Sequence, residues 1–496
     1  MSLTPTTDTT PQASAFGGGQ FDNSYTRLPE RFYARLAPTP VRSPRVVKFN
    51  APLAEELRLD AQQWECEGGV AVLSGNHVPE WADPLAMAYA GHQFGHFVPQ
   101  LGDGRAILLG EIIGADGTRR DLHLKGAGRT PFSRRGDGRA TLGPMLREYI
   151  ISEAMHALGI PTTRSLAVIT TGEPVFRETT LPGAVLARIA ASHIRVGTFE
   201  YFAAQGDREA VKILADYAIA RHYPTLQVTS NPYLALLAAV CEAQAALVAR
   251  WMQVGFIHGV MNTDNMTISG ETIDYGPCAF MDAYDPATVF SSIDHHGRYA
   301  FGNQPRIAHW NLACFANTLL LLLDDNQERA IALAEDTINQ FPARFERYWQ
   351  EGMRRKLGLV SEQPDDVGLV HELLALMQEH AADYTNTFRL LCTVAEGDTA
   401  LAGYEAWVTR WHKRLEHELH SRHAAAALMR AHNPAVIPRN HRVEAAINAA
   451  VQQNDFTPLE ILLIVLSRPF DLKPEHAEYS APPTPSERVL QTFCGT

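Results

Sequence analysis

Two short runs of apolar residues in the first third of the chain have the length and the setting of β-strands. RAILLGEII (105–113) and RRDLHLKG (119–126) are each bounded by Gly-rich turns. Apolar or alternating runs of this length between turn residues are typical of strands. The pattern therefore predicts a strand-rich segment at this point in the chain.

One helix is expected to interrupt these strands, and helices dominate the rest of the chain. In TLGPMLREYIISEAMHALGIP (141–161) the apolar residues keep helical spacing, with Thr141 as the N-cap. Apolar or amphipathic helical patterns follow at 231–253 and 310–323. A strand-rich half that carries one helix, followed by a helical half, predicts an α+β fold with two lobes.

Composition and charge exclude several classes of partner. Of 496 residues, 46% are hydrophobic and 20% are charged, and 55 acidic against 43 basic residues give a net charge of -12. Such a chain is unsuited to general binding of nucleic acid or anionic membranes, and apolar runs such as LEILLIVL (459–466) are too short to span a bilayer. The six Cys residues lack metal-binding spacing and residues 1–20 lack a signal-peptide pattern, so we expect a cytoplasmic protein.

The segment GFIHGVMNTDN (255–265) resembles the catalytic loop of protein kinases, in which H-R-D is followed by four residues and an Asn. His258 and Asn265 have the separation of the kinase His and Asn, but Val260 occupies the place of the catalytic Asp. The nearest acid is Asp264, beside Asn265. The loop alone leaves open transfer of phosphate, transfer of another group, or no activity.

A metal site is predicted at the segment that follows this loop. MTISGETIDYG (266–276) has two short β-type runs joined by a Ser-Gly pair, which is the pattern of a hairpin. A tight hairpin brings Asn265 and Asp274 side by side, and hard cations such as Mg²⁺ bind oxygen ligands of this kind. The tripeptide that begins at Asp274 also resembles the kinase D-F-G, whose Asp binds the metal. The alternative is a plain surface hairpin with an Asx turn.

A lysine and a glutamate have the chain order of the kinase nucleotide-binding pair. On the predicted strand 119–126, His123 and Lys125 face the side opposite two leucines, and Glu148 follows on the predicted helix. A strand Lys that pairs with a helix Glu and contacts phosphate is the kinase arrangement. The alternative is a surface ion pair, which contributes little energy.

Two Gly-rich stretches and two arginines complete the candidate phosphate contacts. LGDGRAILLG (101–110) leads into a strand and RRGDGRATLG (134–143) leads into a helix, so backbone N–H groups of both can approach phosphates. Arg188 and Arg195 carry guanidinium groups suited to phosphate oxygens. Tight turns and surface arginines are the alternatives, because neither stretch matches the P-loop pattern.

Five longer segments resemble selenoprotein O and its bacterial homologues, a family of kinase-fold proteins. They are YAGHQFGHFVPQLGDGRA, LKGAGRTPFSRRGDGRATLGPMLREYIISEAM, ARIAASHIRVGTFEYFA, GFIHGVMNTDNM and IDYGPCAFMDAYDP. The resemblance covers nearly the whole chain after the N-terminal tail. It implies adenylylation, in which AMP from ATP is joined to Ser, Thr or Tyr hydroxyls of proteins and pyrophosphate leaves. It also implies that ATP is bound upside down relative to kinases, and some bacterial members use UTP and Mn²⁺ to transfer UMP.

The same resemblance assigns roles to residues of this chain. It implies that Asn265 and Asp274 bind the metal, that Asp264 accepts the proton, and that Glu148 pairs with Lys125. The implied nucleotide contacts are Gly102, Gly104, Arg105, Lys125, Asp137, Gly138, Arg188, Arg195 and Asp274.

The resemblance also raises the question of whether this chain is under redox control. Family members often carry selenocysteine or Cys near the C-terminus, where this chain has Cys494. In some members that residue pairs with a Cys in the loop after the Asp-Tyr-Gly motif. The usual position in that loop is Phe290 here, and Cys278 is its only thiol.

The sequence therefore predicts a protein-kinase-like two-lobed α+β fold with N- and C-terminal extensions. The expected parts are a disordered polar tail (1–20), an N-terminal extension (21–100), a nucleotide-binding N-lobe (101–204), a helical C-lobe with the catalytic loop (205–430) and a C-terminal helical extension with a tail (431–496).

The predicted activity is metal-dependent transfer of AMP from ATP, or of UMP from UTP, to protein hydroxyls. Mg²⁺ or Mn²⁺ is the expected cofactor, and neither nucleic acid nor a membrane is an expected partner. A kinase-type phosphotransferase and a non-catalytic nucleotide-binding module are the alternatives. The acid at Asp264, with Val260 in the kinase position, argues against the first, and the presence of both metal ligands argues against the second.

Overall fold

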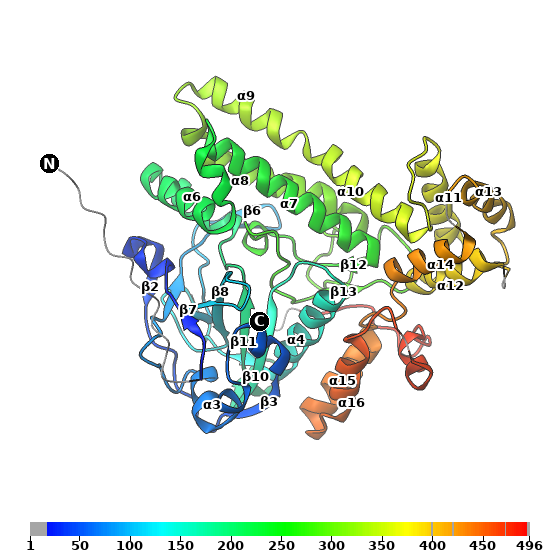
Figure 1. Cartoon of the computed structure of the whole chain (residues 1–496). Coiled ribbons are helices and arrows are strands. Elements are labelled where there is room, and N and C mark those ends of the chain that lie inside the picture. The colour runs from blue at the N-terminus through cyan, green and yellow to red at the C-terminus, as the bar shows by residue number, and fades with distance from the viewer. Residues whose placement is uncertain (1–16, 398–399, 419–420, 472, 494–496) are drawn as a thin grey trace. The chain divides into compact units, whose positions relative to one another are not determined.

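The computed structural model describes residues 17–397, 400–418, 421–471 and 473–493. The chain forms two compact units, and neither is a continuous segment. Unit 1 comprises residues 1–89, 100–145 and 163–193, and unit 2 comprises residues 90–99, 146–162 and 194–496. Strands concentrate in unit 1 and helices in unit 2, so the predicted α+β class is confirmed (Figure 1). The kinase-like arrangement and the domain boundaries stay predictions, and most of the predicted tail, residues 1–20, lies outside the described residues.

Unit 1 is built on an antiparallel sheet of nine strands in its described residues. The strand order is β2-β4-β7-β8-β11-β10-β3, with β1 beside β7 and β9 beside β11. The bounds are β1 Gln20–Phe21, β2 Tyr33–Arg35, β3 Arg45–Phe49, β4 Leu85–Met87, β7 Ala106–Ile113, β8 Arg119–Lys125, β9 Ala140–Thr141, β10 Arg164–Phe176 and β11 Thr180–Ala190. Strands β7 and β8 confirm the two strands predicted from the apolar runs.

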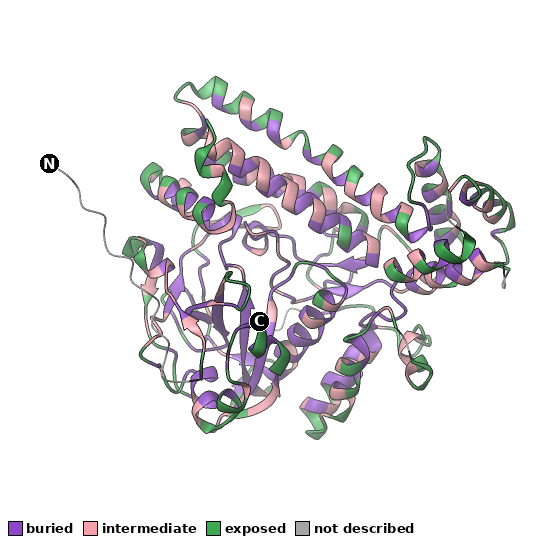
Figure 2. Ribbon diagram, in the orientation of Figure 1, coloured by how far each residue is buried: buried purple, intermediate pink, exposed green. Residues whose placement is uncertain are grey.

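One face of this sheet forms the apolar core of unit 1. Leu122 and Leu124 of β8 and Ala187 of β11 belong to this core, and Trp64 is buried in it. Three short helices, α1 (Ala51–Glu56), α2 (Ala61–Glu65) and α3 (Glu67–Leu73), contribute further apolar residues, and α1 and α3 contact the central strands. Figure 2 shows the central strands as buried. Since side chains alternate along a strand, residues 123 and 125 of β8 and residue 188 of β11 face away from this core.

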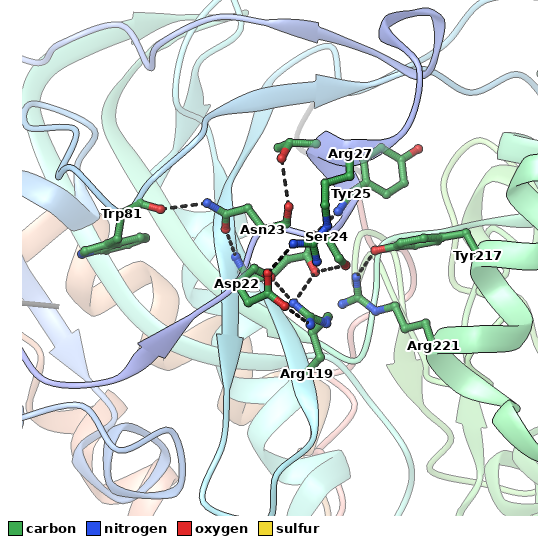
Figure 3. A network of polar contacts seen from close by, with 11 residues as sticks. Asp22, Asn23, Ser24, Tyr25, Arg27, Trp81, Arg119, Tyr217 and Arg221 are labelled. Atoms are coloured by element: carbon green, nitrogen blue, oxygen red, sulfur yellow. Dashed lines mark hydrogen bonds and ion pairs between the residues drawn. The ribbon is translucent and has the colours of Figure 1, made fainter. Parts of the chain in front are cut away.

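Polar contacts fix the first described segment of unit 1 to strands β7 and β8 (Figure 3). The buried Glu111 of β7 accepts hydrogen bonds from the Ser24 hydroxyl and the Tyr25 backbone N–H, each at 2.6 Å. Arg119 of β8 pairs with Asp22 and with Glu111. A buried carboxylate requires such partners, and these bonds hold residues 22–25 against the sheet.

Helix α4 (Leu142–Ala157) confirms the helix predicted between the strands. It ends at Ala157, two residues before Gly159, whose φ of +75° is left-handed, and the Ile160 backbone N–H bonds to the Met155 carbonyl. Glycine adopts this conformation without steric cost, which is why the helix stops here.

Unit 2 is mainly helical and carries two short antiparallel strand pairs in its described residues. The helices are α5 Val196–Ala203, α6 Arg208–His222, α7 Pro232–Val254, α8 Gln304–Leu323, α9 Gln327–Ile338, α10 Phe341–Lys356, α11 Asp366–Glu379, α12 Tyr384–Glu396, α13 Glu405–Leu415, α14 Arg422–His432, α15 Asn440–Gln453 and α16 Thr457–Leu466. The strand pairs are β5 (Gly91–Gln93) with β6 (His96–Val98) and β12 (Phe256–Ile257) with β13 (Ala279–Phe280).

Helix α7 is central in unit 2 and packs against α8 and α10 (Figure 1). The Asn231 side chain caps its N-terminus, and Gly255 ends it with a φ of +74°. By length and composition alone α7 and residues 301–323 could each span a membrane, but half of each apolar window is buried inside the protein. Buried core helices of soluble proteins also reach this length and apolar composition.

Candidate active site

The catalytic-type loop lies in unit 2 between strands β12 and β13. His258 is fully buried; its Nε2–H donates to the Ile273 carbonyl at 2.9 Å, and its Nδ1 accepts from the Val260 backbone N–H at 3.4 Å. Burial lowers the pKa of His258, in keeping with this neutral ring. The imidazole therefore ties the loop to the residue that precedes Asp274.

The predicted hairpin over residues 266–276 is wrong in its pairing. Among the described residues its two runs do not pair with each other: Thr267 bridges to Arg195, and Thr272 bridges to Thr162. The Thr267 hydroxyl closes the turn by accepting from the Glu271 backbone N–H at 3.0 Å. Segments distant in sequence supply the hydrogen bonds that an isolated hairpin would make internally, so the local pattern misassigned the partner strands.

Arg195 joins the two acidic residues of the candidate site. It precedes helix α5 and is only 2% exposed. Its Nη1 donates to the backbone carbonyl of Asp264 at 2.5 Å and to the carboxylate of Asp274. Asp274 has a φ of +61°, a left-handed conformation that non-glycine residues seldom adopt. The surface-arginine alternative is therefore excluded for Arg195, and Asp264 and Asp274 lie around one guanidinium group.

Asp264 and Asn265 lie on the short 3₁₀ turn Thr263–Asn265. Asp264 is 8% exposed; its Oδ2 accepts from the Gln93 amide at 3.4 Å, and its Oδ1 has no hydrogen-bond partner among the described residues. Burial is the main reason that the pKa of Asp264 rises to about 6. The Asn265 amide donates to the Val260 carbonyl at 2.9 Å, so the amide oxygen is the Asn265 atom suited to a cation. Val260 itself is buried and apolar.

Unit 1 carries the candidate phosphate-binding side chains on the sheet face away from its core. Arg188 of β11 lies opposite His123 of β8, two residues from Lys125 on the same face. Arg188 Nε donates to His123 Nδ1 at 3.1 Å, and His123 Nε2–H donates to Asp103 at 3.2 Å. Lys125 is 7% exposed and Arg188 is buried, so the surface alternatives are excluded for both.

The first Gly-rich stretch (101–110) contacts residues 130–133, which precede the second stretch (134–143), in unit 1. Thr130 Oγ1 donates to the Asp103 carbonyl at 2.7 Å, and Ser133 Oγ donates to the Gly104 carbonyl. Gly102 (φ +64°) and Gly138 (φ +71°) are both left-handed, and a Cβ at Gly138 would lie 2.1 Å from a backbone oxygen. These glycines permit backbone packing that side chains would prevent.

The remaining predicted contacts have separate surroundings. Arg105 accepts a backbone bond from Gly126 at 2.7 Å. Asp137 is exposed and pairs with Arg177 at 2.8 Å, and that contact holds the pKa of Asp137 below its usual value. Glu148 is buried in unit 2, whereas Lys125 belongs to unit 1, so their pairing stays a prediction.

Sequence reasoning missed several polar residues around the site. In unit 2 these are His92, Gln93, Glu200 and Thr263, which contact the catalytic turn or one another. In unit 1 the missed residues are His193, whose ring stacks on that of His123 at 4.1 Å, and Asp121, which binds His193. Burial is the main reason that the pKa of His193 falls to about 3. Residues 91–94 (GHQF) lie within one of the segments that resemble the family, but no local sequence signal indicates which loop they contact.

Comparison with known proteins identifies the family. The chain matches the family described as protein adenylyltransferase SelO over residues 16–467. It is 61% identical over 487 residues to protein nucleotidyltransferase YdiU of Rhizobium meliloti, across 96% of this chain and 99% of the relative. The YdiU protein of Syntrophotalea carbinolica is 60% identical over 482 residues (97% and 98%), and that of Bradyrhizobium sp. strain ORS 278 is 59% identical over 485 residues (96% and 99%). This chain belongs to the SelO family of protein adenylyltransferases.

Proposed function

We propose that this chain transfers AMP from ATP, or UMP from UTP, to Ser, Thr or Tyr hydroxyls of cytoplasmic proteins and releases pyrophosphate. The family match and the names of its relatives support nucleotidyl transfer to protein. One structural observation carries the choice of chemistry: the buried acid Asp264 adjoins Asn265, and the kinase base position holds the apolar Val260. Nucleic acid and membranes have no role in this proposal.

Asp264 is the proposed general base. The acceptor hydroxyl oxygen bonds to the α-phosphorus, the bond from that phosphorus to the departing pyrophosphate breaks, and Asp264 takes the hydroxyl proton. The carboxylate has one oxygen engaged with Gln93, and its Oδ1 has no hydrogen-bond partner among the described residues.

Asn265 and Asp274 are the proposed holders of Mg²⁺ or Mn²⁺. Their amide and carboxylate oxygens fit a hard divalent cation, and the bond from the Asn265 amide to the Val260 carbonyl directs the nitrogen away from the ligand role. When bound, such a cation supplies positive charge to the nucleotide phosphates. The contact between Arg195 and Asp274 places a second positive group at the same carboxylate.

Lys125, Arg188 and Arg195 are the proposed contacts of the β- and γ-phosphates. Negative charge develops on the departing pyrophosphate, and positive groups held in place stabilise it most in the transition state. Lys125 and Arg188 share one face of the unit 1 sheet, and His123 fixes the plane of the Arg188 guanidinium. Glu148 is the proposed partner that orients Lys125.

Separate labelling of ATP at its α and γ positions tests this function. The chain is incubated with each labelled ATP, Mg²⁺ or Mn²⁺, and a synthetic polypeptide that carries Ser, Thr and Tyr. We expect label on protein from α-labelled ATP alone. Retention from γ-labelled ATP alone would overturn the proposal and establish the kinase-type alternative.

A further inference from the structure

A hairpin from a distant part of the sequence contacts the catalytic turn along its length. Residues 90–99, which contain β5 and β6, belong to unit 2 together with the turn. Three hydrogen bonds join the two segments: His92 N–H to Thr263 Oγ1 (2.7 Å), Gln93 Nε2 to Asp264 Oδ2 (3.4 Å) and Phe94 N–H to Asn262 Oδ1 (3.1 Å). Each of the three residues that precede Asn265 therefore has a hydrogen-bond partner in the hairpin.

The hairpin backbone also packs directly on the Asp264 side chain. A Cβ at Gly91 would lie 2.6 Å from Asp264 Oδ1 and 2.9 Å from its Cβ, which is closer than atoms in contact approach. On the α5 side, a Cβ at Gly197 would lie 3.4 Å from the Asp264 Cα and 2.1 Å from the Ala90 carbonyl oxygen. Asp264 is thus confined between the hairpin and the first turn of α5.

Behind the turn, three side chains close a ring of hydrogen bonds. The Thr263 hydroxyl donates to Glu200 Oε2 at 2.5 Å, and His92 Nδ1 contacts Glu200 Oε1 at 2.5 Å. The same hydroxyl accepts from the His92 backbone N–H. Glu200 is buried, and burial raises its pKa, so its two oxygens need these partners. Thr263 is held from both sides, and Asp264 is its immediate neighbour.

Cys314 adds a third potential metal ligand beside this ring, but the ring is already satisfied. The donor atoms of His92, Glu200 and Cys314 lie within 4.8 Å of one another. Both Glu200 oxygens and the His92 Nδ1 are engaged in the bonds just described. Burial raises the pKa of Cys314 to about 12, and a metal binds the thiolate, not the thiol. The ring therefore fits a hydrogen-bonded support better than a metal centre.

We propose that the hairpin 90–99 positions the general base, with His92, Glu200 and Thr263 as positioning residues and Gln93 as the residue that orients the carboxylate. This inference rests on the proposed role of Asp264. The ring of hydrogen bonds fixes the position of Thr263. Because Asp264 is the next residue in the chain, its position is fixed as well. Gln93 binds Oδ2 and the Gly91 backbone covers the buried Oδ1, so the hairpin holds both oxygens of the carboxylate in place.

Thr263→Val and Thr263→Ser in the full chain test the inference with α-labelled ATP. The valine has the shape of threonine but removes both bonds of the hydroxyl, whereas serine keeps them. We expect Thr263→Val to lower kcat roughly tenfold to hundredfold, as a small misplacement of a catalytic group does, with little change in the KM for ATP or in Tm. Thr263→Ser should recover most of the lost turnover. Thr409→Val, at an exposed position of α13, is the matched control.

The same change in an Asp264→Ala background separates positioning from general damage. If Thr263 acts through Asp264, Thr263→Val adds no further loss there. An equal further loss, or wild-type kcat in Thr263→Val itself, would overturn the inference. Full activity of Asp264→Ala alone would instead refute the base assignment. If Thr263→Val fails to fold, Gln93→Leu is used, with the same expected loss of kcat. Stoichiometric binding of zinc to the parent chain that is lost in Cys314→Ser would also overturn the inference, in favour of a metal centre.

Discussion

Arg195 and Asp274 form an ion pair between the start of helix α5 and the Asp-Tyr-Gly segment, in which the guanidinium is buried and the carboxylate is 20% exposed. Seventy-nine positions separate the two residues in the sequence. The same Arg195 nitrogen also donates to the Asp264 carbonyl, so one guanidinium fixes the proposed base and a proposed metal ligand relative to each other. A buried guanidinium needs a carboxylate partner, and loss of either member of such a pair is costly.

Asp274→Asn should abolish metal-dependent transfer and leave the fold intact. Asparagine keeps an oxygen to accept from Arg195 but loses the charge that attracts a divalent cation. We expect at least a hundredfold loss of label transfer at a fixed metal concentration, partly recovered by more metal, with circular dichroism unchanged. Asp336→Asn, exposed on α9, is the matched control. Full activity of Asp274→Asn at low metal would show that the cation binds elsewhere.

Asp264→Ala should reduce turnover without weakening nucleotide binding. Loss of a positioned general base lowers rates by roughly 10²- to 10⁴-fold. The bond from Arg195, a proposed phosphate contact, goes to the Asp264 backbone carbonyl, which alanine keeps. The change also removes a buried charge that has one oxygen without a partner, so the Tm should not fall. Steady-state kinetics and ATP titration check both points, with the exposed Asp325→Ala as control. A loss of ATP affinity with kcat intact would contradict the assignment.

A disulfide between Cys278 and Cys494 is the redox prediction. Cys494 lies outside the described residues, but Thr492 pairs with the Phe290 backbone at 2.7 Å and donates to the Pro277 carbonyl at 2.6 Å. The C-terminal segment thus reaches the neighbour of Cys278, whose thiol is buried. Under oxidising conditions we expect a 278–494 cross-linked peptide by mass spectrometry, lost in Cys278→Ser and in Cys494→Ser. Unchanged peptide maps with and without reductant would argue against the pair.

Lys356 should make the free energy of unfolding depend on pH. The residue is 2% exposed, its amine lies 4.1 Å from the centre of the Phe388 ring, and burial lowers its pKa from 10.5 to about 7. Between these values the unfolded chain binds one proton more than the folded chain. The free energy of unfolding therefore rises with pH across this window, by up to ~1.4 kcal/mol per pH unit.

The comparison of Lys356→Met with the parent chain isolates the contribution of Lys356 to the pH dependence of the free energy of unfolding. Methionine has no amine to protonate, so the variant should gain stability over the parent chain as the pH falls from 10 to 7. Denaturant unfolding at several pH values measures the difference, and Lys413→Met, at an exposed position, should show no such trend. A constant difference between the two chains from pH 7 to 10 would mean that Lys356 stays charged in the folded protein.

The sequence by itself determined the local elements and the identity of the family. Strands β7 and β8 and helices α4 and α7 follow from hydrophobic spacing and from caps and glycines at their ends, because these signals act within a few residues. The alternation along β8 also placed Lys125 on the face opposite the core. The chain order of the motifs was enough to name the chemistry.

Only the tertiary structure decided which segments contact one another. The pattern over 266–276 predicted a hairpin, yet Thr267 and Thr272 bridge to segments far away in the chain. The pairing of Arg195 with Asp274 and the hairpin over Thr263 join residues 79 and 171 positions apart. The sequence shows which residues have hydrogen-bonding groups but not which group each will bind, and loop closure over long separations depends on the whole fold. Periodicity can therefore show which residues are polar and buried, but not which of them meet.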